Sequence, residues 1–305
     1  MSKKKLDFAK KLLSSGELVI FPTETVFGLG ADATNDKAVK SIFKVKKRPS
    51  SNPIICHFKN IKQIEKYFTL NKYEKKIGLK FWPGPLTIIL KKRKNSKISK
   101  LVSNNSSLVG CRIPSNKLAN KLISSFDVPI AAPSANLSER TSVTNIKDID
   151  PILVKKIFVL KDKQSSYGLE STVIRINNKN RIEVLRYGSI TVEELNKFAK
   201  VEINKKSSIS PGNLKKHYST LKPIRMNAKN ILKDEGLLNF GNNKLNSKII
   251  NLNLSNKKNL NEAAKNFYHF LHKLDKSGCK KIAVAEIPNK GLGKTINDRL
   301  KRAIK

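Results

Sequence analysis

The stretch that decides the fold is Glu17-Leu18-Val19-Ile20-Phe21-Pro22-Thr23-Glu24-Thr25-Val26-Phe27-Gly28-Leu29-Gly30. Its first five residues are predicted to form a short apolar strand, which Pro22 ends because proline has no N–H for a strand ladder. Two hydroxyls and a carboxylate then precede two glycines. Loops at strand ends bind ligands in α/β sheets, but Thr and Glu also cap turns and helices. Taken alone, the stretch could therefore be a ligand-binding loop or only a capped turn.

Apolar spacing on both sides of this stretch predicts a mixture of helices and strands. Period-3.6 patterns indicate helices at 5–14, 35–46, 60–80 (one or two), 116–126, 145–155 and 191–200. Short apolar runs indicate strands at 53–58, 86–92, 108–113, 129–132, 157–160, 171–176 and 182–187. Several of these strands are close in sequence, which favours an α/β (α+β-like) domain with a mixed sheet.

The composition changes after residue 200, which suggests a domain boundary. Residues 202–210 are polar, and Pro211-Gly212 marks a turn. We therefore predict a first domain at 1–200, a linker at 201–224 and a smaller α/β domain at 225–305. For that last domain the patterns indicate strands near 224–227, 236–240, 248–254 and 281–287, and helices at 259–276 and 294–304.

The net charge of the 305-residue chain is +39, from 62 Lys+Arg and 23 Asp+Glu. Such a charge is typical of proteins that bind nucleic acids or anionic surfaces. However, there are 52 Lys but only 10 Arg, with 31 Asn, and the excess is spread along the chain, +23 in residues 1–200 and +16 in 201–305. This favours a solvated, lysine-rich surface, so the scarce arginines are more informative than the lysines.

Membrane insertion and secretion are not expected. The longest apolar stretches, such as 86–90, are far shorter than the ~20 residues of a membrane span, and the first residues lack the apolar region of a signal peptide.

The three cysteines, Cys56, Cys111 and Cys279, are scattered. This excludes a disulfide framework and the usual zinc ribbons, and it indicates a cytoplasmic protein. No metal-ligand set is evident; His269 and His272 share a helix face without a third ligand.

One arginine stands inside an apolar strand. Arg112 lies in Val109-Gly110-Cys111-Arg112-Ile113-Pro114, and a buried guanidinium needs a carboxylate or phosphate partner. An outward-facing arginine on a half-exposed strand is the alternative. Similarly, Lys44–Arg48 could clamp phosphates or only stabilise a helix C-terminus. The turn that contains Ser134 and Asn136 could point into a cleft or be a plain Asx turn.

In their order along the chain and in their amino-acid sequences, these segments resemble those of one family. Its motifs are Pro22-Thr23-Glu24-Thr25-Val26-Phe27-Gly28-Leu29, Lys46-Lys47-Arg48-Pro49, Asn52-Pro53, Trp82-Pro83-Gly84-Pro85-Leu86-Thr87, Arg112-Ile113-Pro114, Ala132-Pro133-Ser134-Ala135-Asn136 and Glu170-Ser171-Thr172. Together they look like the YrdC/Sua5 family. Ser210-Pro211-Gly212, His217-Tyr218, Gly291-Leu292-Gly293 and Ile296-Asn297-Asp298-Arg299-Leu300 are similar to the linker and C-terminal domain of its longer, Sua5-type members.

The resemblance implies a fold and an activity. The fold would be a twisted open mixed sheet with a basic concave cleft, followed by a smaller Rossmann-like domain. The activity would be that of a nucleotidyltransferase which makes L-threonylcarbamoyladenylate from L-threonine, bicarbonate or CO₂, and ATP, releasing pyrophosphate. A separate transferase complex would use the product to modify adenosine 37 of tRNA, so direct RNA binding is not required. Mg²⁺ is expected to arrive with ATP, without a metal cage from the protein.

The resemblance also implies roles for individual residues. Arg112 would hold the threonine carboxylate, and the other residues on the threonine side would be Thr23, His57, Ser134 and Ser171. Lys46 and Arg48 would hold ATP phosphates, and the other residues on the nucleotide side would be Asn136, Thr144, Arg186 and Tyr218. No covalent catalyst is expected. Tyr218 implies that the 201–224 linker covers the active site as a lid.

Two departures from the family pattern concern this site. Phe27 stands where the family commonly has Tyr, and Ser219-Thr220 replaces the usual Ala-Pro after His217-Tyr218. Two alternative functions share this fold. A non-catalytic protein of this fold could bind double-stranded RNA or tRNA in its basic cleft. A carbamoyl-adenylating module of hydrogenase maturation would need a zinc-bearing segment that three scattered cysteines exclude.

Overall fold

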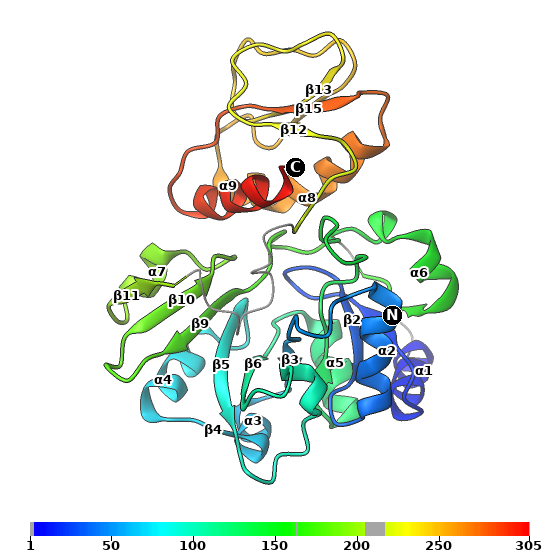
Figure 1. Ribbon diagram of the computed structural model, residues 1–305, viewed down its shortest axis with the longest axis vertical. Helices are drawn as coiled ribbons and strands as arrows, with labels where there is room; N and C mark the ends of the chain where they lie inside the picture. The colour runs from blue at the N-terminus through cyan, green and yellow to red at the C-terminus, as the bar shows by residue number, and fades with distance from the viewer. Residues whose placement is uncertain (1–2, 163, 205–216, 305) are drawn as a thin grey trace.

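The chain forms a larger domain with a twisted sheet and a smaller domain above it (Figure 1). The computed structural model describes residues 3–162, 164–204 and 217–304. The Pro211-Gly212 turn and the Ser210-Pro211-Gly212 motif lie outside these ranges. In the described residues the larger sheet has 11 strands and the smaller has 4. The α/β character and the mixed sheet predicted from the sequence are confirmed.

The stretch from Glu17 to Gly30 forms a hairpin with a polar loop. Strand β1 (Val19–Phe21) pairs antiparallel with β2 (Gly28–Asp32), and the threonine loop joins them. The sequence patterns did not assign β2. A Cβ on Gly30 would lie 2.7 Å from the Phe21 ring and 2.9 Å from Ile130. Glycine is therefore required where this strand packs against its neighbours.

The larger sheet mixes parallel and antiparallel pairs. Both β3–β6 and β5–β9 are parallel, while β5–β6, β9–β10 and β2–β7 are antiparallel. The order across the sheet is β11 (Val201–Ile203), β10 (Ile182–Arg186), β9 (Thr172–Ile176), β5 (Leu86–Lys92), β6 (Leu108–Arg112), β3 (Cys56–His57), β7 (Ile130–Ala131), β2, β1 and β8 (Phe158–Val159), with β4 (Phe68–Thr69) beside β5. Strand β11 occupies the start of the predicted linker, because it pairs in parallel with β10.

Helices cover both faces of this sheet and enclose two apolar cores. Helix α2 packs on one core, whereas α1 and α5 pack on the other. The expected helix at 145–155 is divided, because Asp150-Pro151 starts a new helix with proline at its first turn. The elements are α1 (Lys3–Ser14), α2 (Asp36–Lys46), α3 (Ile61–Tyr67), α4 (Lys72–Phe81), α5 (Lys117–Phe126), α6 (Pro151–Lys156), α7 (Val192–Asn196) and 3₁₀ turns at Lys100–Ser103 and Ile146–Asp148.

The smaller domain is a parallel sheet with two helices. Its strand order is β12 (Ile224–Arg225), β15 (Lys281–Val284), β13 (Glu235–Asn239) and β14 (Asn251–Asn253). All three pairs are parallel, as expected for a Rossmann-like unit. Figure 1 shows α8 (Leu260–Lys276) and α9 (Leu292–Ala303) on the side of this sheet that faces the larger domain. These helices therefore form the contact between the domains.

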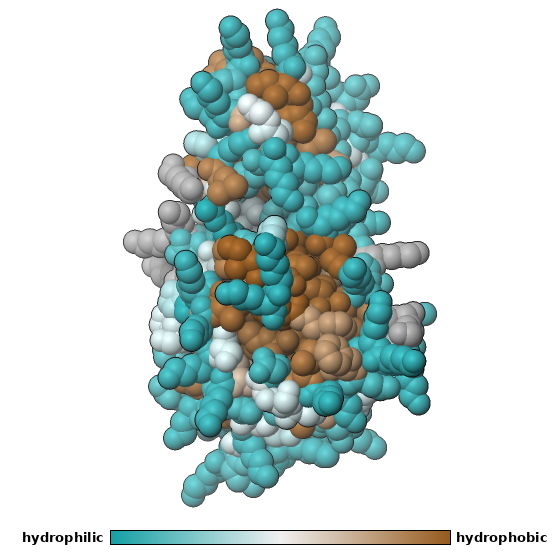
Figure 2. All heavy atoms as spheres, turned by 90° about the vertical axis from the view of Figure 1, so that its right-hand side faces the viewer, coloured by the Kyte–Doolittle hydropathy of each residue, from teal (hydrophilic) through white to brown (hydrophobic). Residues whose placement is uncertain are grey.

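The side of the larger domain that carries α6 has an apolar surface (Figure 2). Helix α6 contributes Ile152 and Val154, which are 59% and 47% exposed.

None of the helices in the described ranges combines the length and the apolar character that a bilayer-spanning helix needs.

The larger core gives a testable prediction. Phe58 is 0% exposed and packs edge-to-face on Phe68, with ring centroids 5.7 Å apart. Phe58→Ala is expected to lower the free energy of unfolding by about 3–5 kcal/mol, because it removes buried contacts and leaves a cavity. Leu79→Ala, at a side chain that is 66% exposed, is the control and should change it by less than about 0.5 kcal/mol. Urea unfolding measures both, and equal effects would contradict the assignment of this core.

Candidate active site

A single cavity lies where the threonine loop, the ends of β3, β6, β9 and β10 and the residues after 216 meet. It holds about 580 Å³ of empty space, part of it open to solvent. Its polar lining is Thr23, Thr25, Arg48, His57, Arg112, Ser134, Ser142, Glu170, Ser171, Arg186, His217 and Tyr218. Eight of the predicted site residues are therefore brought together from distant parts of the chain.

The threonine loop is fixed by its own hydroxyls. The Thr23 hydroxyl donates to the Val26 carbonyl at 2.6 Å and accepts from the backbone N–H groups of Thr25 and Val26, each at 3.2 Å. Because its proton is used in this way, the 2.9 Å contact between the two threonine hydroxyls has Thr25 as donor. The two interpretations of this loop, a capped turn and a ligand-binding loop, are compatible, because the threonines that fix the turn also line the cavity.

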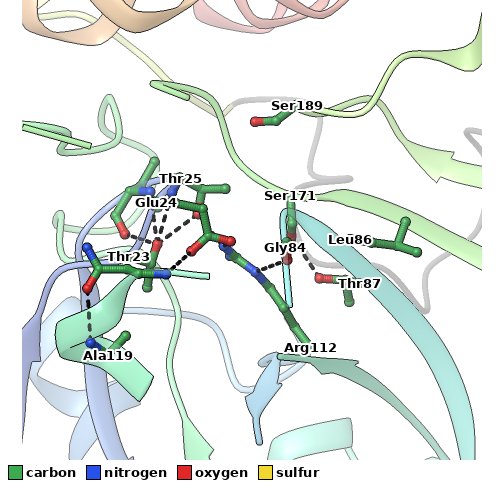
Figure 3. A network of polar contacts seen from close by, with 12 residues as sticks. Thr23, Glu24, Thr25, Gly84, Leu86, Thr87, Arg112, Ala119, Ser171 and Ser189 are labelled. Atoms are coloured by element: carbon green, nitrogen blue, oxygen red, sulfur yellow. Dashed lines mark hydrogen bonds and ion pairs between the residues drawn. The ribbon is translucent and has the colours of Figure 1, made fainter. Parts of the chain in front are cut away.

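Arg112 is buried and has a carboxylate partner, Glu24 (Figure 3). Its Nη2 lies 2.6 Å from Glu24 Oε1, its Nη1 donates to the Thr25 hydroxyl at 2.8 Å, and its Nε donates to the Gly84 carbonyl at 3.2 Å. Glu24 therefore supplies the carboxylate partner that a buried guanidinium needs. Of the five N–H groups of a guanidinium, two remain for a ligand.

His57 lies beside Arg112, because β3 and β6 pair in parallel with these two residues in register. Burial and the neighbouring Arg112 guanidinium lower the pKa of His57 from 6.5 to about 3. The imidazole is therefore neutral at pH 7, and its Nδ1 is buried without a hydrogen-bond partner in the described part of the chain. It can donate or accept a hydrogen bond, but it adds no charge.

Two further arginines add positive charge to the cavity. Arg48 donates to the carbonyl oxygens of Asn52 and Pro53 at 3.1 and 2.8 Å, and these neutral partners do not cancel its charge. Burial, and to a lesser extent repulsion from Arg186, lower the pKa of Arg48 to about 10, so it is charged at pH 7. Arg186 donates to the carbonyl and the hydroxyl of Ser171 at 2.8 and 3.1 Å. Such a cavity favours anionic ligands.

Three predicted residues do not line this cavity. Lys46 is 1% exposed, and its ammonium group donates to the carbonyl of Ser134 at 2.6 Å and to the carbonyl of Asn136. Burial, with repulsion from Arg48, lowers the pKa of Lys46 well below its ordinary value. The Asn136 amide donates to the carbonyls of Leu137 and Arg140. The Thr144 hydroxyl is buried without a partner among the described residues.

Glu170 and Ser171 connect the cavity to its surroundings. The Ser171 hydroxyl lies 2.8 Å from that of Thr87 on β5. Burial would raise the pKa of Glu170, but Arg299, Arg186 and hydrogen bonds from Ser142 and Tyr268 outweigh it and lower this pKa to about 2. Glu170 is therefore a carboxylate at pH 7.

His217 and Tyr218 complete the wall of the cavity. Their rings lie 3.9 Å apart between centroids, and Tyr218 has a left-handed backbone, with φ of 64°. The Tyr218 hydroxyl is buried and has no hydrogen-bond partner in the described ranges. Burial lowers the pKa of His217 to about 3. A buried hydroxyl without a partner is costly, so it is suited to contact a ligand.

Several functional residues were not singled out from the sequence. Thr25 and Glu24 belong to the first family motif, which predicts no separate role for them, and Ser142 lies in none of the motifs. Arg299 on α9, which bonds Glu170 at 2.9 Å, also had no predicted role. One signal could have found it: Arg299 stands three residues after Ile296, on the apolar face of an amphipathic helix.

The two buried histidines give a pH prediction. Below pH 6.5 the unfolded chain takes up a proton at His57 and His217, whereas the folded chain does so only near pH 3. The free energy of unfolding therefore falls as the pH is lowered, by about 2 kcal/mol per histidine between pH 7 and 5. Urea unfolding at both pH values should show this loss, and His217→Gln should reduce it by about 2 kcal/mol. An equal loss in both proteins would contradict the prediction. Glu170 contributes little between pH 7 and 5, because its ordinary pKa of 4.5 in the unfolded chain lies below this range.

The comparisons agree with the motifs over the full chain. A family model described as telomere recombination, named for Sua5, YciO and YrdC, matches residues 11–188, and one described as threonylcarbamoyl-AMP synthase, C-terminal domain, matches residues 190–304. The threonylcarbamoyl-AMP synthase of Pyrococcus abyssi is 30% identical over 98% of this chain and 94% of its own length. That of Bacillus subtilis is 38% identical over 71% of this chain and 64% of its own length.

A solved structure also resembles the whole molecule. The crystal structure of Pyrococcus abyssi Sua5 complexed with L-threonine has a TM-score of 0.88 and 28% identity, covering 99% of this chain and 95% of that one. The fold, the order of the motifs and a full-length relative agree. The chain belongs to the Sua5, YciO and YrdC family and carries the C-terminal domain of threonylcarbamoyl-AMP synthases.

Proposed function

We infer that the chain synthesises L-threonylcarbamoyladenylate from L-threonine, bicarbonate or CO₂, and ATP, with release of pyrophosphate. It is thus a nucleotidyltransferase that performs the first step of threonylcarbamoyl-adenosine formation in tRNA. The observation that carries this function is the convergence of Arg48, Arg112 and Arg186 with hydroxyl groups in one cavity. Both substrates bring anionic groups, a carboxylate and a triphosphate, and buried guanidinium groups bind such anions.

The reaction consists of two bond-forming steps. The threonine amine attacks CO₂ and loses a proton, which gives a carbamate. A carbamate oxygen then attacks the α-phosphorus of ATP, and the bond from this phosphorus to the bridging oxygen breaks to release pyrophosphate. Nothing in this sequence needs a covalent enzyme intermediate. The protein would act by positioning the two anions and by stabilising charge on the phosphates.

On the threonine side, we propose Arg112 as the carboxylate ligand. Its two remaining N–H groups are available while Glu24 and Thr25 hold the rest of the guanidinium. The hydroxyls of Thr23, Ser134 and Ser171 are the proposed polar contacts. A neutral His57 would form a hydrogen bond with threonine, and it would not compete with Arg112 as a cationic partner of the threonine carboxylate.

On the nucleotide side, we propose Arg48 and Arg186 for the phosphates and the Tyr218 hydroxyl as a further contact. Lys46 uses two of its three N–H groups to hold the carbonyls of Ser134 and Asn136. We propose that it shapes this loop, and its predicted contact with an ATP phosphate stays a prediction. The predicted roles of Asn136 and Thr144 stay predictions.

Mg²⁺ is proposed to arrive on the ATP phosphates, where it would neutralise charge. The described residues contain no group of three or more His, Cys, Asp or Glu side chains that could hold a metal. The cavity carboxylate Glu170 and the nearby Glu24 are engaged by Arg299 and Arg112.

The remaining predictions concern organisation and context. We propose that 1–200 is the catalytic domain, that 201–224 links it to 225–305, and that His217-Tyr218 closes over the nucleotide. The product would pass to a separate tRNA threonylcarbamoyl transferase complex. A cytoplasmic location stays a prediction, in line with the free, buried state of Cys56, Cys111 and Cys279.

Arg48 allows a matched test of the activity. Pyrophosphate release should require ATP, threonine and bicarbonate together, and Arg48→Ala should lower kcat/KM by about 100-fold, because it removes charge from the phosphates. The adjacent, exposed Lys47 gives the control Lys47→Ala, which should keep the wild-type rate. Circular dichroism checks that both variants fold. Threonine-independent turnover, or equal rates in both variants, would refute the assignment.

Arg112 needs a test that separates its structural role from its role in binding. Arg112→Ala leaves Glu24 buried without its partner, which should cost about 3–5 kcal/mol of unfolding free energy. The double variant Glu24→Gln with Arg112→Gln removes both charges and should recover most of this loss, yet it should still make no product. Urea unfolding and product assays measure the two effects. Product formation at the wild-type rate by the double variant would show that Arg112 does not bind substrate.

A further inference from the structure

Glu170 joins the two domains at the edge of the cavity. It precedes Ser171, and its Oε1 accepts hydrogen bonds from Ser142 at 2.5 Å and from Tyr268 at 2.7 Å. Its Oε2 lies 2.9 Å from Nε of Arg299. Two of these three donors, Tyr268 and Arg299, come from helices α8 and α9 of the smaller domain. That domain therefore determines the surroundings of a carboxylate that lines the cavity.

The Arg299 side chain contacts three segments that form or adjoin the cavity wall. Besides Glu170, its Nη2 donates to the carbonyl of Tyr187 at 2.5 Å, and its guanidinium carbon lies 4.5 Å from the centroid of the Tyr218 ring. Its Nη1 donates to Asp298 at 2.8 Å. Arg299 is 1% exposed and is not among the residues that line the cavity.

Each part that Arg299 contacts includes or adjoins a proposed ligand residue. Glu170 is bonded to Ser171 in the chain, Tyr187 follows Arg186, and Tyr218 itself lines the cavity. One planar group thus fixes the β9 entrance, the end of β10 and the residues after 216 relative to one another. Lysine could keep the ion pair with Glu170, but it lacks the planar fork and the stacking face.

We propose that Arg299 is a positioning residue through which the C-terminal domain completes the active site. Arg299 sets the separation of Ser171, Arg186 and Tyr218. The expected effect of this positioning on catalysis rests on the proposed function. Some contacts between the domains lie away from the residues that line the cavity. Lys294, for example, bonds Glu193 at 3.0 Å, with side chains 34% and 51% exposed.

The kinetic test uses Arg299→Lys in the full chain, with Lys294→Ala as control. The lysine variant should keep its melting temperature within a few degrees of the wild type while kcat/KM for ATP falls by at least tenfold. The control should match the wild type in both measurements. Wild-type kcat/KM in Arg299→Lys would overturn the proposal, because a role limited to domain attachment is rescued by the retained charge.

A second measurement does not depend on turnover. Hydrogen exchange of the ligand-free protein should be faster in Arg299→Lys at residues 170–172, 186–189 and 217–219, and unchanged in β5 and β6. Unchanged exchange in those three segments would overturn the proposal even if activity fell. A wild-type protein that releases no pyrophosphate would refute the proposed function, whereas the exchange result would still decide whether Arg299 positions the cavity wall.

Discussion

The arrangement of the two domains around the cavity depends on the buried ion pair between Arg299 and Glu170. A guanidinium and a carboxylate that are 1% and 6% exposed cannot stay charged in the interior unless each is paired and fully hydrogen-bonded. Here the requirement is met only when α9 lies against the entrance to β9, since Nε and Oε2 are 2.9 Å apart. The pair thus gives the domains one mutual position, at the place where substrate would bind.

The same constraint explains where the positive charge of the chain has its effect. Most of the +39 is carried by lysines, whereas four of the ten arginines are buried, and all four line or adjoin the cavity: Arg48, Arg112, Arg186 and Arg299. Carboxylates neutralise Arg112 and Arg299, while Arg48 bonds carbonyl oxygens. Bulk charge is therefore a poor guide to function here, and the distribution of the scarce guanidinium groups is a good one.

Local patterns predicted the elements well where a strand or helix is decided by its own residues. Strand β5 was predicted with its observed limits, 86–92, because most of it is the apolar stretch 86–90. Strand β2 was missed, since Gly28-Leu29-Gly30-Ala31-Asp32 has no β-branched residue and is a strand only through its pairing with β1 and β7. The partner of Arg112 was missed for a similar reason: Glu24 is 88 residues away, and no spacing rule connects them.

In the Lys46-Lys47-Arg48 motif the first and last side chains lie in different surroundings. Lys46 is the last residue of α2, and Lys47 leaves the helix with a left-handed backbone, so the side chains on either side of it point to different surroundings. Arg48 reaches the cavity, while the ammonium of Lys46 is held by the carbonyls of Ser134 and Asn136. Its lowered pKa reflects that burial, and the two carbonyls offset part of the desolvation cost. The motif thus places Arg48 at the cavity and Lys46 on the loop that contains Ser134, which makes the position of Ser134 depend on the helix that precedes Arg48.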